Sequence, residues 1–267
     1  RGRVCALMGE NGAGKSTLMK ILIGVYTPTS GVIKFKGEEV RIKNPNEALN
    51  KGIAMIHQEL NPIVERSIME NIWLGREPLK GKLGIIDHKK MYDDTIELLK
   101  NLNLDLNPKE KMKNLTVAQM QMVEIVKAVS YNSEIVIMDE PTSSLTNKEV
   151  EHLFKMIEEL KKQGKAIAYI SHKMDEIFRI SDDITILRDG KYVGSYESKE
   201  MNSEKLINLM VGREIKDLFP KTNCDIGETK LKVQNLSHHK SFNNVNFEIK
   251  KGEILGFAGL VGSGRTE

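Results

Sequence analysis

A glycine-rich segment near the start of the chain constrains the fold more than any other feature. Gly9-Glu-Asn-Gly-Ala-Gly14-Lys15-Ser16 fits the pattern G-x-x-x-x-G-K-[ST] at every fixed position. The apolar run Val4–Met8 before it predicts a buried strand, and the apolar spacing over Lys15–Ile23 predicts a helix. In such a strand, loop and helix, backbone N–H groups surround phosphate oxygens and the helix adds its positive N-terminal end. An ordinary glycine turn is the weaker interpretation, because strand and helix flank the complete motif.

The position of each residue in this loop predicts its role. Lys15 would reach the β- and γ-phosphates of a nucleotide, and the hydroxyl of Ser16 would bind Mg²⁺. The expected cofactors are therefore ATP and Mg²⁺. The residues predicted to contact the nucleotide are Gly9, Glu10, Asn11, Gly12, Ala13, Gly14, Lys15, Ser16 and Thr17.

A pair of acids supplies the second half of the predicted site. Ile135-Val-Ile-Met-Asp139-Glu140 is an apolar strand that ends in two carboxylates, which places them at the carboxyl edge of a parallel sheet. Asp139 is expected to bind Mg²⁺ through water, and Glu140 to polarise the attacking water. Many buried strands end in acids, so this pattern is weak alone. Combined with the glycine-rich loop it indicates a nucleotide hydrolase.

Strand and helix patterns alternate along the first part of the chain, which predicts an α/β fold with a parallel sheet covered on both faces. Between Gln58 and Ser133 the helix patterns dominate, and we expect an inserted helical subdomain over about 61–130. The other strands are expected over 52–57, 134–138 and 166–170, and the helices over 87–102, 119–130, 148–163, 174–180 and 204–220.

The chain also contains an internal repeat. Lys251-Gly-Glu-Ile-Leu-Gly-Phe-Ala-Gly259 repeats the start of the chain, with Gly259 in the place of Gly9 and Gly264 in the place of Gly14. The period is too long for a solenoid, so it predicts two copies of one domain. We expect a first copy over 1–225 that lacks its N-terminal strands. The truncated start of a second copy, over 226–267, would begin with two strands within 231–248.

The composition limits the kinds of partner and compartment that we expect for this chain. The 267 residues carry 40 basic and 37 acidic side chains, a formal net charge of +3, so no nucleic acid is expected as a partner. No stretch approaches the roughly 18 apolar residues of a membrane helix, so any link to a membrane would run through another protein. Cys5 and Cys224 match no metal-binding spacing and indicate a reducing compartment.

The motifs, in their order along the chain, resemble the ATP-binding subunits of ABC transporters. The glycine-rich loop, Gln58, Asp139-Glu-Pro-Thr142 and Ser171-His172 carry the resemblance, which covers the entire chain. It implies that Gln58 senses Mg²⁺ and the membrane partner, and that His172 contacts the γ-phosphate. Without the resemblance, Gln58 is a surface polar residue and His172 a neighbour of a helix cap. The predicted catalytic residues are Glu140, His172 and Lys15, and the predicted metal-binding residues are Ser16, Gln58 and Asp139.

Three segments are similar to the sugar-import branch of this family: Met55-Ile-His-Gln-Glu-Leu, Gln119-Met-Gln-Met-Val-Glu-Ile and Pro141-Thr-Ser-Ser-Leu-Thr146. The resemblance implies a peripheral ATPase on the cytoplasmic face of the cell membrane. It would energise import of a monosaccharide such as galactose or methylgalactoside. Membrane permease subunits and, through them, a sugar-binding protein would be its partners. That branch carries two ATPase domains in tandem, in agreement with the repeat.

The alternatives are of other classes. A soluble tandem ABC ATPase acting on ribosomes or nucleic acid would share the glycine-rich loop, but it generally has a long charged linker and an intact signature. A subunit that binds ATP without hydrolysing it is disfavoured by Glu140. The short linker of this chain and its lack of a basic block favour the transport interpretation.

Two departures from the family pattern affect one site. The family signature Leu-Ser-Gly-Gly-Gln, which reaches the γ-phosphate held by a paired domain, reads Leu115, Thr116, Val117, Ala118 and Gln119 here. Val117 and Ala118 lack the conformational freedom of glycine. In the second glycine-rich loop, Arg265 before Thr266 replaces the lysine, and a planar guanidinium does not substitute for a compact ammonium. We therefore expect pairing with the second domain to give one competent site, on Lys15 and Glu140, and one degenerate site.

Overall fold

The computed structural model describes residues 2–57, 60–81, 84–212, 224–239, 241–259 and 263–264. The chain divides into two compact units, residues 1–214 and 215–267. The first unit is built on one six-stranded sheet, and the second on a two-stranded hairpin.

The strands of the large sheet follow the order β10-β9-β1-β8-β7-β4. They are β1 (Val4–Met8), β4 (Ile53–Ile56), β7 (Ile135–Asp139), β8 (Ala166–Ile170), β9 (Asp183–Arg188) and β10 (Lys191–Glu197). Every neighbouring pair is parallel except β10 with β9. The predicted α/β fold with a largely parallel sheet is confirmed.

The two faces of the sheet belong to two hydrophobic cores. Val4, Ala6 and Met8 of β1 are buried in the larger core, whereas Leu7 belongs to the smaller one. This alternation follows from the two-residue period of a strand. Because both faces are covered, the central strands read as continuous apolar runs rather than as alternating ones.

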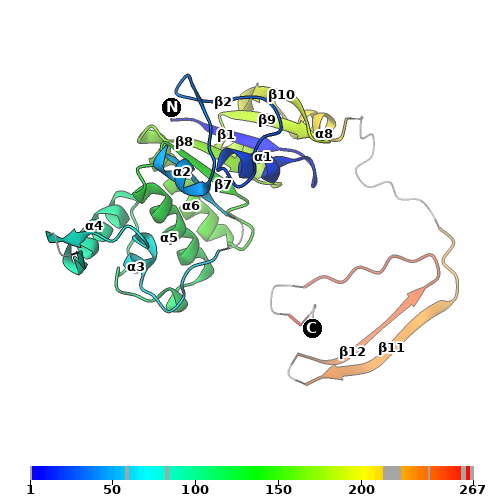
Figure 1. Ribbon diagram of the computed structural model, residues 1–267. Helices are drawn as coiled ribbons and strands as arrows, with labels where there is room; N and C mark the ends of the chain where they lie inside the picture. Colours follow the sequence, from blue (N-terminus) through cyan, green and yellow to red (C-terminus); the bar gives the residue numbers. More distant parts are fainter. Residues whose placement is uncertain are drawn as a thin grey trace. The chain divides into compact units, whose positions relative to one another are not determined.

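Helices cover the sheet and form the inserted part of the first unit. Beside the sheet lie α1 (Lys15–Leu22), α2 (Pro45–Asn50), α6 (Asn147–Lys162), α7 (Met174–Ile180) and α8 (Ser203–Val211). The inserted part contains α3 (Ile68–Ile72), α4 (His88–Asn101) and α5 (Val117–Ser130), which lie together away from β9 and β10 (Figure 1). Its buried residues, such as Ile68 and Val123, join the larger core, so sheet and insertion share one interior.

Several elements were not predicted, most of them short. They are the hairpins β2 (Ile33–Phe35) with β3 (Glu38–Val40) and β5 (Leu79–Lys80) with β6 (Ile85–Ile86), the helices α2 and α3, the strands β9 and β10, and the 3₁₀ turns η2 (Met112–Asn114) and η3 (Ser198–Glu200). Most are too short for a hydrophobic period to develop, but β9 and β10, with six and seven residues, are longer than the predicted β1.

The helix predicted over 204–220 is wrong at its C-terminal end. α8 stops at Val211 because Gly212 takes a left-handed conformation, with φ 78°, and its N–H donates to the carbonyl of Asn208. A glycine in this conformation is a common helix terminator. The rest of the predicted range, from residue 213, lies outside the described residues.

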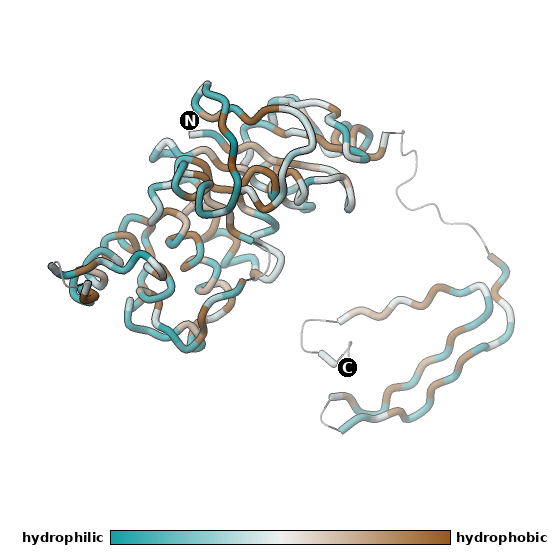
Figure 2. The backbone as a smooth tube through the Cα atoms, viewed as in Figure 1, coloured by the Kyte–Doolittle hydropathy of each residue, from teal (hydrophilic) through white to brown (hydrophobic). Residues whose placement is uncertain are grey.

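The second unit holds β11 (Thr229–His238) and β12 (Phe242–Lys250), which pair antiparallel. Hydrophobic and hydrophilic residues alternate along both strands (Figure 2), which is the pattern of a sheet with one apolar face. The two predicted strands in this region are confirmed, whereas the second domain copy stays a prediction. Throughout the described residues, no helix combines the length and the apolar character needed to cross a membrane.

Candidate active site

The glycine-rich loop connects β1 to α1 and has a backbone conformation that strongly favours glycine at two points. Gly14 precedes α1 with φ 96°, and Gly12 has φ 85°, both in the left-handed region. At Gly9 the limit is steric, because a Cβ atom would lie 2.4 Å from the carbonyl oxygen of Leu187 in β9. The loop therefore lies directly on the neighbouring strand.

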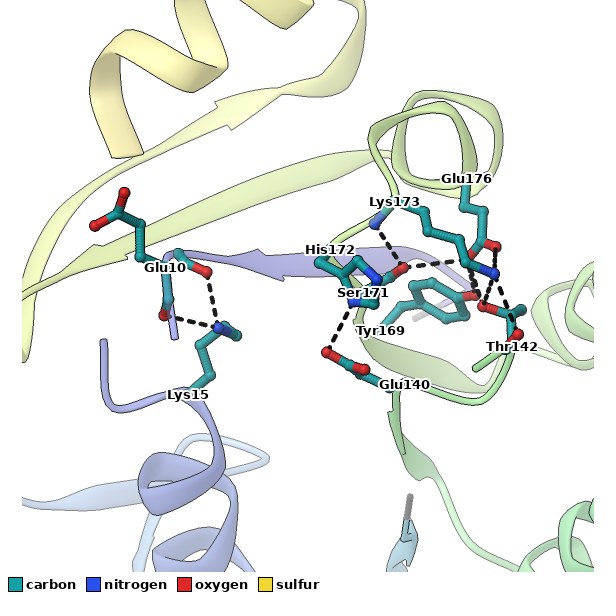
Figure 3. Close-up of polar contacts among 10 residues, drawn as sticks. Glu10, Lys15, Glu140, Thr142, Tyr169, Ser171, His172, Lys173 and Glu176 are labelled. Carbon is teal, nitrogen blue, oxygen red and sulfur yellow. Dashed lines mark hydrogen bonds and ion pairs between the residues drawn. The ribbon is translucent and has the colours of Figure 1, made fainter. Parts of the chain in front are cut away.

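Lys15 folds back over this loop. Its Nζ donates to the carbonyl oxygens of Gly9 at 2.8 Å and Glu10 at 3.0 Å (Figure 3). Burial lowers the pKa of Lys15, while the nearby carboxylates of Glu140 and Asp139 act in the opposite direction. The ammonium group is thus held at the pocket by two uncharged acceptors.

Asp139 ends β7 next to Ile170, the last residue of β8, with which it is in register. It is only 9% exposed. Burial and the charge of Glu140 raise the pKa of Asp139, against the effects of His57, Lys15 and a hydrogen bond with the Ser16 side chain. A buried carboxylate in this position gains from a cation.

Glu140 follows in an unusual backbone conformation, with φ 46°. Its N–H donates to the carbonyl of Ile170 at 2.9 Å, which fixes the turn after β7 to the end of β8. The Oε1 of Glu140 lies 3.1 Å from Nδ1 of His172 (Figure 3). A left-handed conformation at a non-glycine residue costs about 1–3 kcal/mol, which the surrounding structure must offset. Since the His172 side chain is 65% exposed, the pair lies at the mouth of the site.

These segments enclose one pocket of about 600 Å³. Its lining residues are Asn11, Gly12, Gly14, Lys15, Ser16, Thr17, Asp139, Glu140, Ile170 and His172. Gly9, Glu10 and Ala13 belong to the loop without lining the pocket, and Gln58 lies outside the described residues. Ile170 is a lining residue that the sequence analysis missed, because nothing in an apolar strand distinguishes its last residue.

The signature segment begins α5 and does not line this pocket. Thr116 and Gln119 form a capping box: the Thr116 hydroxyl accepts from the Gln119 N–H at 3.2 Å, and the Thr116 N–H donates to the Gln119 side chain at 2.9 Å. Val117 is 50% exposed, Ala118 is buried, and Leu115 packs on the larger core. The residue types of this segment are therefore compatible with a stable helix start.

In the second glycine-rich loop, the structure describes Gly259 and Gly264. Gly264 has φ 80°, and a Cβ there would lie 2.5 Å from the carbonyl oxygen of Ser241. Arg265 and Thr266 lie outside the described residues.

The comparisons with known proteins agree with these motifs. The model of the ABC transporter family matches residues 1–143. Over the whole of this chain, a galactose/methyl galactoside import ATP-binding protein of Photobacterium profundum is 61% identical, and one of Clostridium perfringens is 57% identical. The chain covers 54% and 52% of these proteins, so it spans about half the length of the curated relatives it matches.

Among solved structures, a nucleotide-free ATP-binding cassette from an ABC transporter superposes with a TM-score of 0.68 and 23% sequence identity. The match covers 82% of this chain and 89% of that chain. At this identity the likeness shows the fold alone.

Proposed function

Because the chain belongs to the ABC transporter family, which confirms the resemblance seen in its motifs, we propose that it binds and hydrolyses ATP to energise sugar import. One observation carries the proposal. Lys15 and Ser16 after β1, Asp139 and Glu140 at the end of β7, and His172 after β8 all line a single pocket.

The phosphates of ATP fit the loop between β1 and α1. In the described residues α1 begins without a side-chain cap, so its first N–H groups are available to phosphate oxygens. Lys15 would exchange the carbonyls of Gly9 and Glu10 for the β- and γ-phosphates. Negative charge next to Lys15 would also favour its charged form, against the effect of burial.

Magnesium is proposed as the metal, held by the Ser16 hydroxyl and the Asp139 carboxylate, which line the same pocket. Mg²⁺ typically takes one or two protein oxygens and completes its shell with phosphates and water. In the described part of the chain, no group of three or more His, Cys, Asp or Glu side chains could hold a metal. Ligands from the nucleotide are therefore needed. When bound, the ion would neutralise charge on the phosphates; Gln58 is proposed as a further ligand.

Hydrolysis would proceed by in-line attack of water on the γ-phosphorus, with cleavage of the bond to the β-phosphate oxygen. Glu140 would accept a hydrogen bond from the attacking water and orient it. Lys15 would stabilise the charge that develops on the departing phosphates. His172 is proposed to contact the γ-phosphate from the same side as Glu140, to which it is already hydrogen bonded.

The names of the relatives support the proposed cargo, and membership of the ABC transporter family supports the kind of partner. We infer import of galactose, methyl galactoside or a similar monosaccharide, with permease subunits and a sugar-binding protein as partners. The chain would act at the cytoplasmic face of the membrane. Pairing with a second ATPase domain would complete the nucleotide sites, and residues 226–267 are proposed as the start of that domain.

The two sites of such a pair are proposed to differ. Val117 and Ala118 in the signature, and Arg265 in the second loop, would fall on the same composite site and weaken it. The other site, on Lys15 and Glu140, would carry turnover.

The test is sugar-stimulated ATP hydrolysis by the complete protein, reconstituted in vesicles with its permease subunits and its sugar-binding protein. Galactose, methyl galactoside and ribose would be compared, with Glu140→Gln as the control. We expect one of these sugars to stimulate hydrolysis, and the substitution to lower the stimulated rate by about 100-fold or more. Glu140-dependent hydrolysis that no sugar stimulates would refute the cargo, and hydrolysis indifferent to Glu140 would refute the site.

A further inference from the structure

A buried carboxylate lies behind the candidate active site. Glu176, in the first turn of α7, is 8% exposed. Its Oε2 accepts three hydroxyl hydrogen bonds, from Thr142 at 2.8 Å, Tyr169 at 2.9 Å and Ser171 at 3.2 Å (Figure 3). Three donors on one oxygen satisfy a charge that would otherwise be expensive to bury.

Lys173 interacts with the other carboxylate oxygen of Glu176. Its Nζ lies 3.1 Å from Oε1 of Glu176, and it also donates to the carbonyl oxygen of Thr142 at 3.1 Å and to its hydroxyl at 3.3 Å. The backbone N–H of Lys173 donates to the hydroxyl of Ser171 at 3.0 Å. The carboxylate therefore has charge-assisted partners on both oxygens, which are among the stronger hydrogen bonds in proteins.

The donors come from the two segments that carry the candidate catalytic groups. Thr142 stands two residues after Glu140, in the turn after β7. Ser171 directly precedes His172, in the turn after β8. The two turns also meet next to the pocket, through the Glu140 N–H bond to Ile170 and the side-chain contact between Glu140 and His172. Through its hydrogen bonds to Thr142 and Ser171, Glu176 therefore connects the same two turns that meet at the pocket.

We propose that Glu176 is a positioning residue for ATP hydrolysis: by holding the hydroxyls of Thr142 and Ser171, it sets how Glu140 and His172 face each other and the γ-phosphate. The inference rests on the proposed function. Glu176 does not line the nucleotide pocket and is not expected to touch ATP. Its removal should therefore lower kcat far more than it weakens ATP binding.

The substitution Glu176→Ala leaves three hydroxyls without their acceptor and Lys173 without its ion pair, so we expect the two turns to shift. A displacement of about 1 Å at reacting groups lowers rates by about 100-fold. We expect kcat to fall by about 10- to 100-fold, with KM and the ATP dissociation constant changed by less than about 3-fold. Glu176→Gln keeps an oxygen for the hydroxyls, so it should restore part of the rate.

Glu151→Ala is the matched control. Glu151 in α6 forms an ion pair with Arg179 of α7, but its side chain is 51% exposed, and the charged residues that act on it, Arg179 and Lys155, lie in helices and in neither turn. Its removal should leave kcat within about 2-fold of the wild type. Thr142→Val provides a variant that retains Glu176 and the shape of the side chain. It should lower kcat by about 3- to 10-fold even if Glu176→Ala does not fold.

The measurements are ATP binding, steady-state hydrolysis and the unfolding temperature of the complete protein, with Glu140→Gln measured alongside. If the wild type shows Glu140-dependent hydrolysis, and both Glu176→Ala and Thr142→Val leave kcat unchanged, the positioning role is wrong and the proposed function stands. The positioning role is also wrong if Glu176→Ala lowers kcat no more than Glu151→Ala does, or if its only effect is weaker ATP binding. If no hydrolysis depends on Glu140, the proposed function and this inference fall together.

Discussion

The contact between the glycine-rich loop and β9 gives a prediction whose size follows from the structure. In Gly9→Ala, the new Cβ would lie 2.4 Å from the carbonyl oxygen of Leu187 and 3.0 Å from the Cβ of Ala13. An ordinary contact between these atom types needs about 3.4 Å, so the loop must move by about 1 Å, since the obstacle is backbone. Overpacking of this kind destabilises a fold by about 1–3 kcal/mol.

The same displacement of the loop should also weaken nucleotide binding. The Gly9 carbonyl accepts a hydrogen bond from Lys15 at 2.8 Å, so a shift of Gly9 would also displace the loop and the lysine that are proposed to bind the phosphates. We expect ATP affinity to fall by about 10- to 100-fold, which is about 1.4–2.8 kcal/mol. Denaturant unfolding and titration with ATP measure the two effects separately.

Gly2→Ala is the control for a general loss of stability. Gly2 has φ 67°, and its Cβ would lie 2.9 Å from the carbonyl oxygen of Lys161, away from the pocket residues. This variant should be destabilised without a change in ATP affinity. If Gly9→Ala binds ATP as the wild type does, or if Gly2→Ala loses as much affinity, the steric argument is refuted.

Two further predictions concern charge. Lys15→Ala should keep the fold but lower ATP affinity by about 100-fold, because it removes the cation at the phosphates; unchanged binding in an ATP titration would contradict the assigned role. Burial acts to raise the pKa of Asp182, but hydrogen bonds from Lys161 and from the Val4 N–H, both at 2.8 Å, hold it below the ordinary 3.8. Because the pKa of Asp182 is lower in the folded than in the unfolded state, its carboxylate stabilises the fold above pH ~4. This stabilisation is lost as the pH falls through the folded-state pKa. Asp182→Asn should therefore cost about 1–3 kcal/mol at pH 7 and progressively less as the pH falls below ~4, measured by denaturant unfolding; a cost independent of pH would contradict it.

Much of the site could be predicted because its chemistry is local in sequence. The glycine-rich loop, the strand before it and the helix after it are one continuous segment, and the acids at Asp139 and Glu140 directly follow an apolar strand. The content of helix-forming residues located α4 and α5 to within a few residues, and an amphipathic pattern located α6. Most of the missed elements contain less than two turns of a helix, or two or three residues of strand, and develop no period, whereas β9 and β10 were missed although they have six and seven residues.

What only the tertiary structure decided is how distant segments meet. No local pattern states that β8 pairs with both β1 and β7, yet this order places Lys15, Glu140 and His172 around one pocket. The left-handed backbone of Glu140 and the burial of Glu176 beneath three hydroxyls likewise arise from packing between segments. The sequence by itself predicted which residues would carry phosphate chemistry, because loop conformation and strand ends depend on near neighbours. Strand order and side-chain networks depend on which apolar faces can be buried together, and this is a property of the whole fold.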